Sequence, residues 1–195
     1  MRILGVDPSL RCTGYGVVEC NGAGLRLLEG GVIAPRVRAP FESRLAELAR
    51  GLADVIEGFQ PDAMIVEEVF SRSGYPKTAL LMAHARGALV STAARARLPV
   101  FNYAATTVKR ALVGRGGASK EQVAAMVVQL LGLRRRPQPP DVTDALALAI
   151  THIHRLPNRA VVRPKVDDRA TDRAVVRPKV DDRATDRAVV RPKVD

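Results

Sequence analysis

The sequence has little that points to an extracellular or membrane-spanning protein. Of its 195 residues only two are cysteine, none is tryptophan, and aromatic side chains make up 4%. Cys12 and Cys20 have no Cys-x-x-Cys spacing, so we interpret both as free structural thiols. No apolar run reaches the roughly 18 residues that a membrane-spanning helix needs, and the amino terminus has no signal-peptide layout. These absences predict a cytoplasmic protein with no membrane partner.

Two common kinds of catalytic motif are missing as well. The sequence has no Gly-x-x-x-x-Gly-Lys-Ser/Thr loop for nucleotide phosphates, and no His and Glu at the helical spacing of a zinc site. The three histidines, His84, His152 and His154, are interpreted as structural or surface residues. P-loop nucleotide chemistry and zinc hydrolysis therefore have no support.

What the sequence has in excess is positive charge, a net +11 from 31 Lys and Arg against 20 Asp and Glu. Residues 160–173 and 174–187 are identical repeats, and a third copy begins at residue 188. The repeats hold 10 of the basic and 7 of the acidic residues, so the first 159 residues keep a net charge of +8. Such short repeats bury too little apolar surface to fold, so we expect one domain over residues 1–158 and a disordered tail over 159–195. A domain this basic indicates a polyanionic partner, either nucleic acid or an anionic membrane.

The spacing of apolar residues predicts an α/β fold. Residues 2–6, 15–20 and 25–33 form strand-like runs, and Asn21-Gly22 is a strong hairpin signal between the last two. The pattern then becomes helical, with short strands between helices. The expected helices are 45–59, 77–97, 106–113, 119–131 and 142–154, and the expected strands between them are 63–66 and 99–101. This order predicts a mixed five-stranded sheet, an antiparallel meander followed by parallel strands, flanked by helices.

Four acidic residues lie at positions where a role in keeping the protein soluble is a poor explanation for the charge. Asp7 ends the first apolar strand, Glu67 ends the strand at 63–66, and Asp141 and Asp144 share one face of the last helix. Asp141 alone is equally well explained as a helix-capping residue, whereas Asp144 adjoins an apolar helix, where an unpaired charge is costly. A carboxylate cluster repels itself unless cations neutralise it. Two Mg²⁺ or Mn²⁺ ions would suit these oxygen ligands and could activate water against a phosphodiester.

Four segments together resemble the RuvC Holliday-junction resolvases. They are, in chain order, Ile3-Leu4-Gly5-Val6-Asp7-Pro8-Ser9, Thr13-Gly14-Tyr15-Gly16-Val17-Val18, Val66-Glu67-Glu68-Val69-Phe70 and Asp141-Val142-Thr143-Asp144-Ala145-Leu146-Ala147. One segment alone is weakly specific, but all of them in this order extend the resemblance over about residues 1–156. The resemblance implies an RNase H-like fold and a homodimeric endonuclease. Such an enzyme cuts four-way DNA junctions by symmetric paired nicks in recombination and repair.

The resemblance also implies roles for individual residues. The four acids would be the catalytic metal ligands, two ions per site, with Asp7 bridging the ions. Phe70 would wedge into the junction, and Lys109 and Lys120 would approach the scissile backbone. The residues that could extend the phosphate-binding surface are Arg72, Lys77, Arg110 and Arg115. Packing in a loop is the plainer explanation of Phe70, and solvation at the surface is the plainer explanation of the two lysines.

The sequence also suggests partners for the protein and leaves alternative functions open. The resemblance suggests work beside the branch-migration proteins RuvA and RuvB. We expect the dimer face on the helix at 77–97, whose apolar residues are spread too widely for one core-facing stripe. One alternative is a sugar kinase or actin-like ATPase, which would need a second similar domain. The others are a related RNase H-like nuclease for RNA or other branched DNA, and a junction-binding protein without catalysis.

Overall fold

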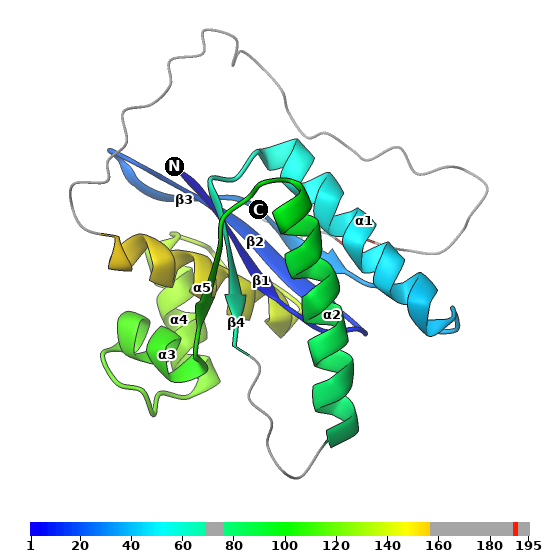
Figure 1. Ribbon diagram of the computed structural model, residues 1–195. Coiled ribbons are helices and arrows are strands. Elements are labelled where there is room, and N and C mark those ends of the chain that lie inside the picture. Colours follow the sequence, from blue (N-terminus) through cyan, green and yellow to red (C-terminus); the bar gives the residue numbers. More distant parts are fainter. Residues whose placement is uncertain (69–75, 157–188, 191–195) are drawn as a thin grey trace, which may run out of the picture.

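The computed structural model describes residues 1–68, 76–156 and 189–190, and it is built on one central sheet (Figure 1). The strand order is β5-β4-β1-β2-β3-β6. The strands are β1 (Arg2–Asp7), β2 (Thr13–Asn21), β3 (Gly24–Ile33), β4 (Ala63–Glu67), β5 (Val100–Tyr103) and β6 (Val189–Val190). β1, β2 and β3 form the antiparallel meander, while β4 and β5 run parallel to β1. The predicted mixed five-stranded sheet is confirmed, and two residues of the repeated tail add β6 beside β3.

Five helices alternate with the later strands in the predicted order. They are α1 (Phe41–Phe59), α2 (Pro76–Arg95), α3 (Ala105–Val113), α4 (Lys120–Leu130) and α5 (Pro140–Arg155). α4 begins with a capping box, in which Ser119 and Gln122 each bond the other's backbone N–H. α1 begins four residues before its predicted start. None of its first four residues is buried and they carry no apolar stripe, so periodicity alone could not locate this turn.

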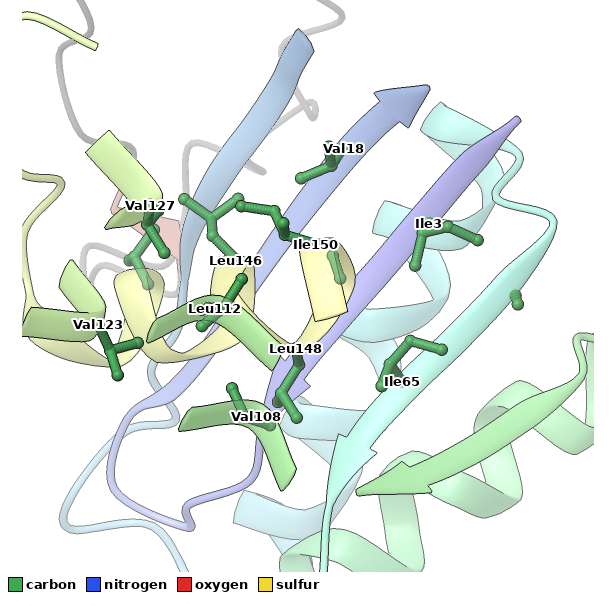
Figure 2. Packing of buried hydrophobic residues seen from close by; sticks show 14 of the residues in the cluster. Ile3, Val18, Ile65, Val108, Leu112, Val123, Val127, Leu146, Leu148 and Ile150 are labelled. Atoms are coloured by element: carbon green, nitrogen blue, oxygen red, sulfur yellow. The ribbon is translucent and has the colours of Figure 1, made fainter. Parts of the chain in front are cut away.

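The helices cover the two faces of the sheet as separate layers. α1 and α2 lie on one face, and α5 lies on the other with α3 and α4 packed outside it (Figure 1). Figure 2 shows the core on the α5 side, where Ile3 and Ile65 from the sheet meet Leu146 and Ile150 from α5. Every α5 residue from Val142 to His152 except Asp144 is buried. α5 is therefore the centre of the domain and not a surface helix.

Glycines in β1 and β2 allow α5 to lie directly against the sheet. A Cβ at Gly5 would collide with the carbonyl oxygen of Ala145, and a Cβ at Gly14 would collide with the backbone of Asp141. Because neither glycine has a side chain, the first turns of α5 are held against the ends of β1 and β2.

The predictions of no membrane-spanning helix and of two free cysteines can both be compared with the described residues. Within them, no helix has the length and apolar character needed to cross a bilayer. Cys12 and Cys20 are both free and half-buried, as expected.

Candidate functional site

Strand alternation places Asp7 and Glu67 on the face of the sheet that α5 covers. In β1, Ile3 packs in the core on the α5 side and Leu4 in the core on the α1 side, so the two-residue period returns Asp7 to the α5 side. Ile65 occupies the same α5-side core, and the same period puts Glu67 there. β1 and β4 are adjacent and parallel, with Val6 opposite Val66. The two carboxylates therefore follow neighbouring strands at one end of the sheet.

The start of α5 brings Asp141, in the first turn, and Asp144, three residues later, to the same end of the sheet. Asp7 pairs with Gly14 across β1 and β2, and Gly14 lies against the backbone of Asp141. Asp141 and Asp144 are each half-buried, although the residues between and after them are buried. The structure thus brings together all four acids that the sequence singled out.

The pKa of Asp7 reflects the closeness of the other three acids. Burial, and after it the negative charge of nearby acids, raise the pKa of the Asp7 carboxyl from its ordinary value of 3.8 to about 7. The negative charges of Glu67, Asp144 and Asp141, in that order, add to this rise in the pKa. Burial also raises the pKa of Glu67, and the charge of Asp144 raises it further. The site accumulates more negative charge than the protein itself neutralises.

Two lysines supply the nearby positive charge. Lys120 Nζ donates a hydrogen bond to Asp144 Oδ2 at 2.7 Å, and this hydrogen bond raises the pKa of Lys120. The charge of Lys120 works against the raised pKa of both Asp7 and Glu67, and Lys109 in α3 acts in the same direction on Glu67. Lys120 thus contacts one of the acids and the charge of Lys109 reaches another, while the predicted approach of both lysines to the scissile DNA backbone stays a prediction.

The donor set has the chemistry of a site for hard divalent cations. Four carboxylates offer only oxygen ligands, and the rise in the pKa of Asp7 reflects burial and, after it, a repulsion between the acids that a cation would relieve. Among the described residues, no three acidic, histidine or cysteine side chains are close enough together to hold a metal ion as they stand. Since Lys120 already contacts Asp144, a metal would require these side chains to rearrange.

The remaining candidate residues are partly exposed, partly buried and partly outside the described residues. Lys77 at the start of α2, Arg110 in α3 and Arg115 after α3 are exposed, as a phosphate-contacting surface requires. Phe70 and Arg72 lie outside the described residues. His152 is buried, and its Nδ1 lies 3.0 Å from the hydroxyl oxygen of Tyr103, which agrees with a structural role.

One basic feature near this end of the sheet does not figure among the residues predicted from the sequence. Residues 11–12 and 34–40 line an open groove that contains Arg11, Arg36 and Arg38. Burial, and next the charge of Asp141, raise the pKa of Cys12 in this groove, so the groove adjoins the acids. The alternation of arginine with proline and valine in residues 35–40 was the available signal.

Comparison with known proteins gives one consistent family. The family model described as "Crossover junction endodeoxyribonuclease RuvC" matches residues 3–152. The chain is similar to a protein of that name from Trichlorobacter lovleyi, with 44% identity over 166 residues, 85% of this chain and 92% of the relative. It is also similar to the Thermus thermophilus RuvC structure, with TM-score 0.74, 37% identity, and coverage of 79% of this chain and 94% of that one.

A second solved structure is relevant to the substrate of the family. It is T. thermophilus RuvC in complex with a Holliday junction substrate, which matches with TM-score 0.72 and 35% identity over 79% of this chain and 94% of that one. The family match, over residues 3–152, covers the four acids, β1 to β5, α1 to α4 and most of α5. From its sequence and its fold, the chain belongs to the RuvC family of crossover junction endodeoxyribonucleases.

Proposed function

We propose that this chain resolves four-way DNA junctions by hydrolysing phosphodiester bonds in two opposed strands. The observation that carries the proposal is the convergence of four carboxylates at one end of a basic domain of this family. A site of this charge would repel a DNA backbone unless metal ions were bound, so the acids favour a catalytic site over a simple binding surface. The substrate is inferred from the T. thermophilus relative, whose structure contains a Holliday junction.

Asp7, Glu67, Asp141 and Asp144 are assigned as ligands of two Mg²⁺ or Mn²⁺ ions. When bound, such ions activate a water molecule and stabilise the leaving oxygen of the scissile bond. Asp7 has the central role among the ligands, because its pKa responds to each of the other three acids. Asp144 would exchange its contact with Lys120 for a contact with metal.

The basic side chains would hold the DNA backbone around the acids. Lys109 and Lys120 are assigned to the phosphates nearest the cut, because their charges already reach Glu67. Lys77, Arg110 and Arg115 are exposed and are assigned to more distant phosphates. Phe70 keeps the junction-wedging role that the family resemblance implies, and Arg72 keeps its predicted place on the wider phosphate-binding surface.

A homodimer would give the paired nicks their symmetry. Leu80 and Leu81 in α2 leave 62% and 44% of their surface exposed, whereas Leu89 on the same helix is fully buried in the core. The exposed pair supports α2 as the contact between two copies of the chain. From the family we also infer that the chain works beside RuvA and RuvB. We infer in the same way that it is located in the cytoplasm.

The proposal is tested on three labelled substrates: a four-way junction, a linear duplex and an RNA/DNA hybrid. Each is incubated with Mg²⁺, with Mn²⁺ or with EDTA, and both binding and cleavage are measured. The expected result is metal-dependent, paired nicks in the junction alone. Cleavage of the hybrid instead would favour the RNase H-like alternative, and binding without any cleavage would favour the non-catalytic one.

A substitution separates catalysis from binding. Asp7→Asn keeps the size of the side chain but weakens its affinity for a divalent cation, so it should abolish cleavage while the junction still binds. Asp54→Asn is the matched control, since Asp54 is exposed on α1. The role of Asp7 would be refuted by a variant that binds the junction weakly yet still cuts it.

A further inference from the structure

The open groove beside the carboxylates is a separate, positively charged feature. It has a volume of about 760 Å³ and is lined by residues 11–12, from the turn after β1, and by residues 34–40, from the loop after β3. We call it the arginine groove, after Arg11, Arg36 and Arg38. No acidic residue is among its lining residues. Its charge therefore favours an anionic ligand.

Two of the three arginines are free to bind such a ligand. Arg11 and Arg38 are exposed and form no ion pair or hydrogen bond through their side chains within the described part of the chain. A guanidinium group presents several N–H donors in one plane, which suits phosphate oxygens. Val37 between Arg36 and Arg38 is 72% exposed, so the groove also has an apolar surface that a sugar could contact.

The third arginine fixes the shape of the loop. The backbone N–H of Arg36 donates to Glu47 Oε2 at 2.8 Å, and its side-chain Nε donates to Glu47 Oε1 at 2.8 Å. Glu47 belongs to α1, so the loop after β3 is fastened to a regular helix. The groove is thus formed before any ligand binds, which lowers the entropic cost of binding.

The register of the sheet places this groove along the line of the carboxylates. Asp7 pairs with Gly14 across β1 and β2, and Thr13 pairs with Ile33 across β2 and β3. The loop after β3 therefore leaves the same end of the sheet as Asp7, about 10 Å away at the usual strand spacing. A DNA strand advances about 3.4 Å per nucleotide, so this separation corresponds to about three nucleotides.

We propose that the arginine groove binds backbone phosphates of the DNA about two to four nucleotides from the cut site, through Arg11 and Arg38. The inference rests on the proposed function, because it takes the DNA strand held at the carboxylates as the ligand. The groove would set the direction in which a junction arm leaves the active site.

The first test is the salt dependence of junction binding in EDTA, where no cleavage occurs. For the double variant Arg11→Ala/Arg38→Ala, the affinity should fall about 10-fold or more, and the slope of log K against log salt should become shallower by about 1 to 2. Arg95→Ala is the matched control. Arg95 is an exposed arginine that ends α2 before β5 begins, at the opposite end of the sheet, and its loss should leave the slope unchanged.

The second test locates the phosphates. Junctions with neutral methylphosphonate linkages at single positions from one to six nucleotides from the cut are compared for the wild-type protein and the double variant. The wild-type protein should lose affinity at positions two to four, and the double variant should lose no more there. A double variant that keeps the wild-type slope, or remains sensitive at the same positions, would overturn the inference. If the wild-type protein neither binds nor cuts the junction, the proposed function fails first.

Discussion

Lys120 Nζ and Asp144 Oδ2 are 2.7 Å apart and join the first residue of α4 to the amino-terminal part of α5. The lysine side chain is 68% exposed and the aspartate side chain 20% exposed. The same ammonium group lowers the raised pKa of Asp7 and Glu67. This ion pair therefore reduces the negative charge that the carboxylate site presents to a metal or to a phosphate.

Replacing Lys120 by methionine should separate the chemistry of this ion pair from its structural contribution. An exposed ion pair contributes at most about 1 kcal/mol, so the free energy of unfolding should change little. Single-turnover junction cleavage with Mg²⁺ should fall about 100-fold, because a charge beside the scissile phosphate is lost. Arg95→Met is the control for loss of a positive charge elsewhere. A large drop in melting temperature with a proportionate loss of cleavage would indicate a merely structural role.

The contribution of Asp7 to the stability of the protein in EDTA should decrease as the pH rises. The folded state holds a proton on Asp7 up to about pH 7, whereas the unfolded chain releases it near pH 3.8. The folded state binds more protons between these values, so its stability falls across this window and levels off above it. The full penalty is roughly 4 kcal/mol.

Asp7→Asn removes that penalty, so in EDTA at pH 8 this variant should be more stable than the wild-type protein by roughly 2 to 4 kcal/mol. Near pH 4 the two proteins should unfold at similar urea concentrations. Urea unfolding at both pH values measures this difference. Asp54→Asn, which keeps Asp7, should differ from the wild type by the same small amount at both pH values. Equal stability of Asp7→Asn and wild type at pH 8 would contradict a buried, self-repelling carboxylate.

Gly14→Ala should disturb the active end of the molecule. The new methyl group would meet the backbone of Asp141, so the first turn of α5 must move away from β2. Overpacking of this kind typically costs about 1 to 3 kcal/mol, and the displaced aspartate should reduce cleavage as well. Gly58→Ala in α1 is the control, since nothing lies within 4 Å of the added Cβ. That change should be neutral or stabilise by about 0.5 to 1 kcal/mol in urea unfolding.

The role of Phe70 can be tested without knowing its position. If it wedges into the junction, Phe70→Ala should slow single-turnover cleavage about 10-fold, a change of about 1.4 kcal/mol in the barrier, with near-normal binding. Unchanged turnover would instead support packing in a loop.

Leu80→Glu should weaken the proposed dimer. A charged side chain in the α2 contact would lose its hydration on association, so the variant should be monomeric at concentrations where the wild-type protein is dimeric. Light scattering after size-exclusion chromatography measures the mass of each. Ala94→Glu, exposed near the other end of α2, is the control. A monomeric wild-type protein would refute the assignment of α2.

Much of the fold could be predicted because the local pattern of apolar residues agrees with the positions that these residues take in the folded protein. Asp7 and Glu67 each end an apolar strand, and a two-residue period fixes the face on which such a residue lies. The contact of Lys120 with Asp144 could not be predicted, because it depends on how α4 packs against α5. The arginine groove combines residues 11–12 with residues 34–40. These segments are far apart in the sequence, and the pairing of β2 with β3 brings them to the same end of the sheet.

The burial of α5 has a consequence for how the enzyme loses activity on heating. Two of its four acids begin a helix that the sheet, α3 and α4 enclose, so their placement cannot loosen unless the core itself opens. Backbone amides in the middle of α5 should therefore exchange with solvent only through global unfolding. Inactivation by heat should then follow the cooperative melting of the whole domain, with no earlier stage confined to the catalytic end.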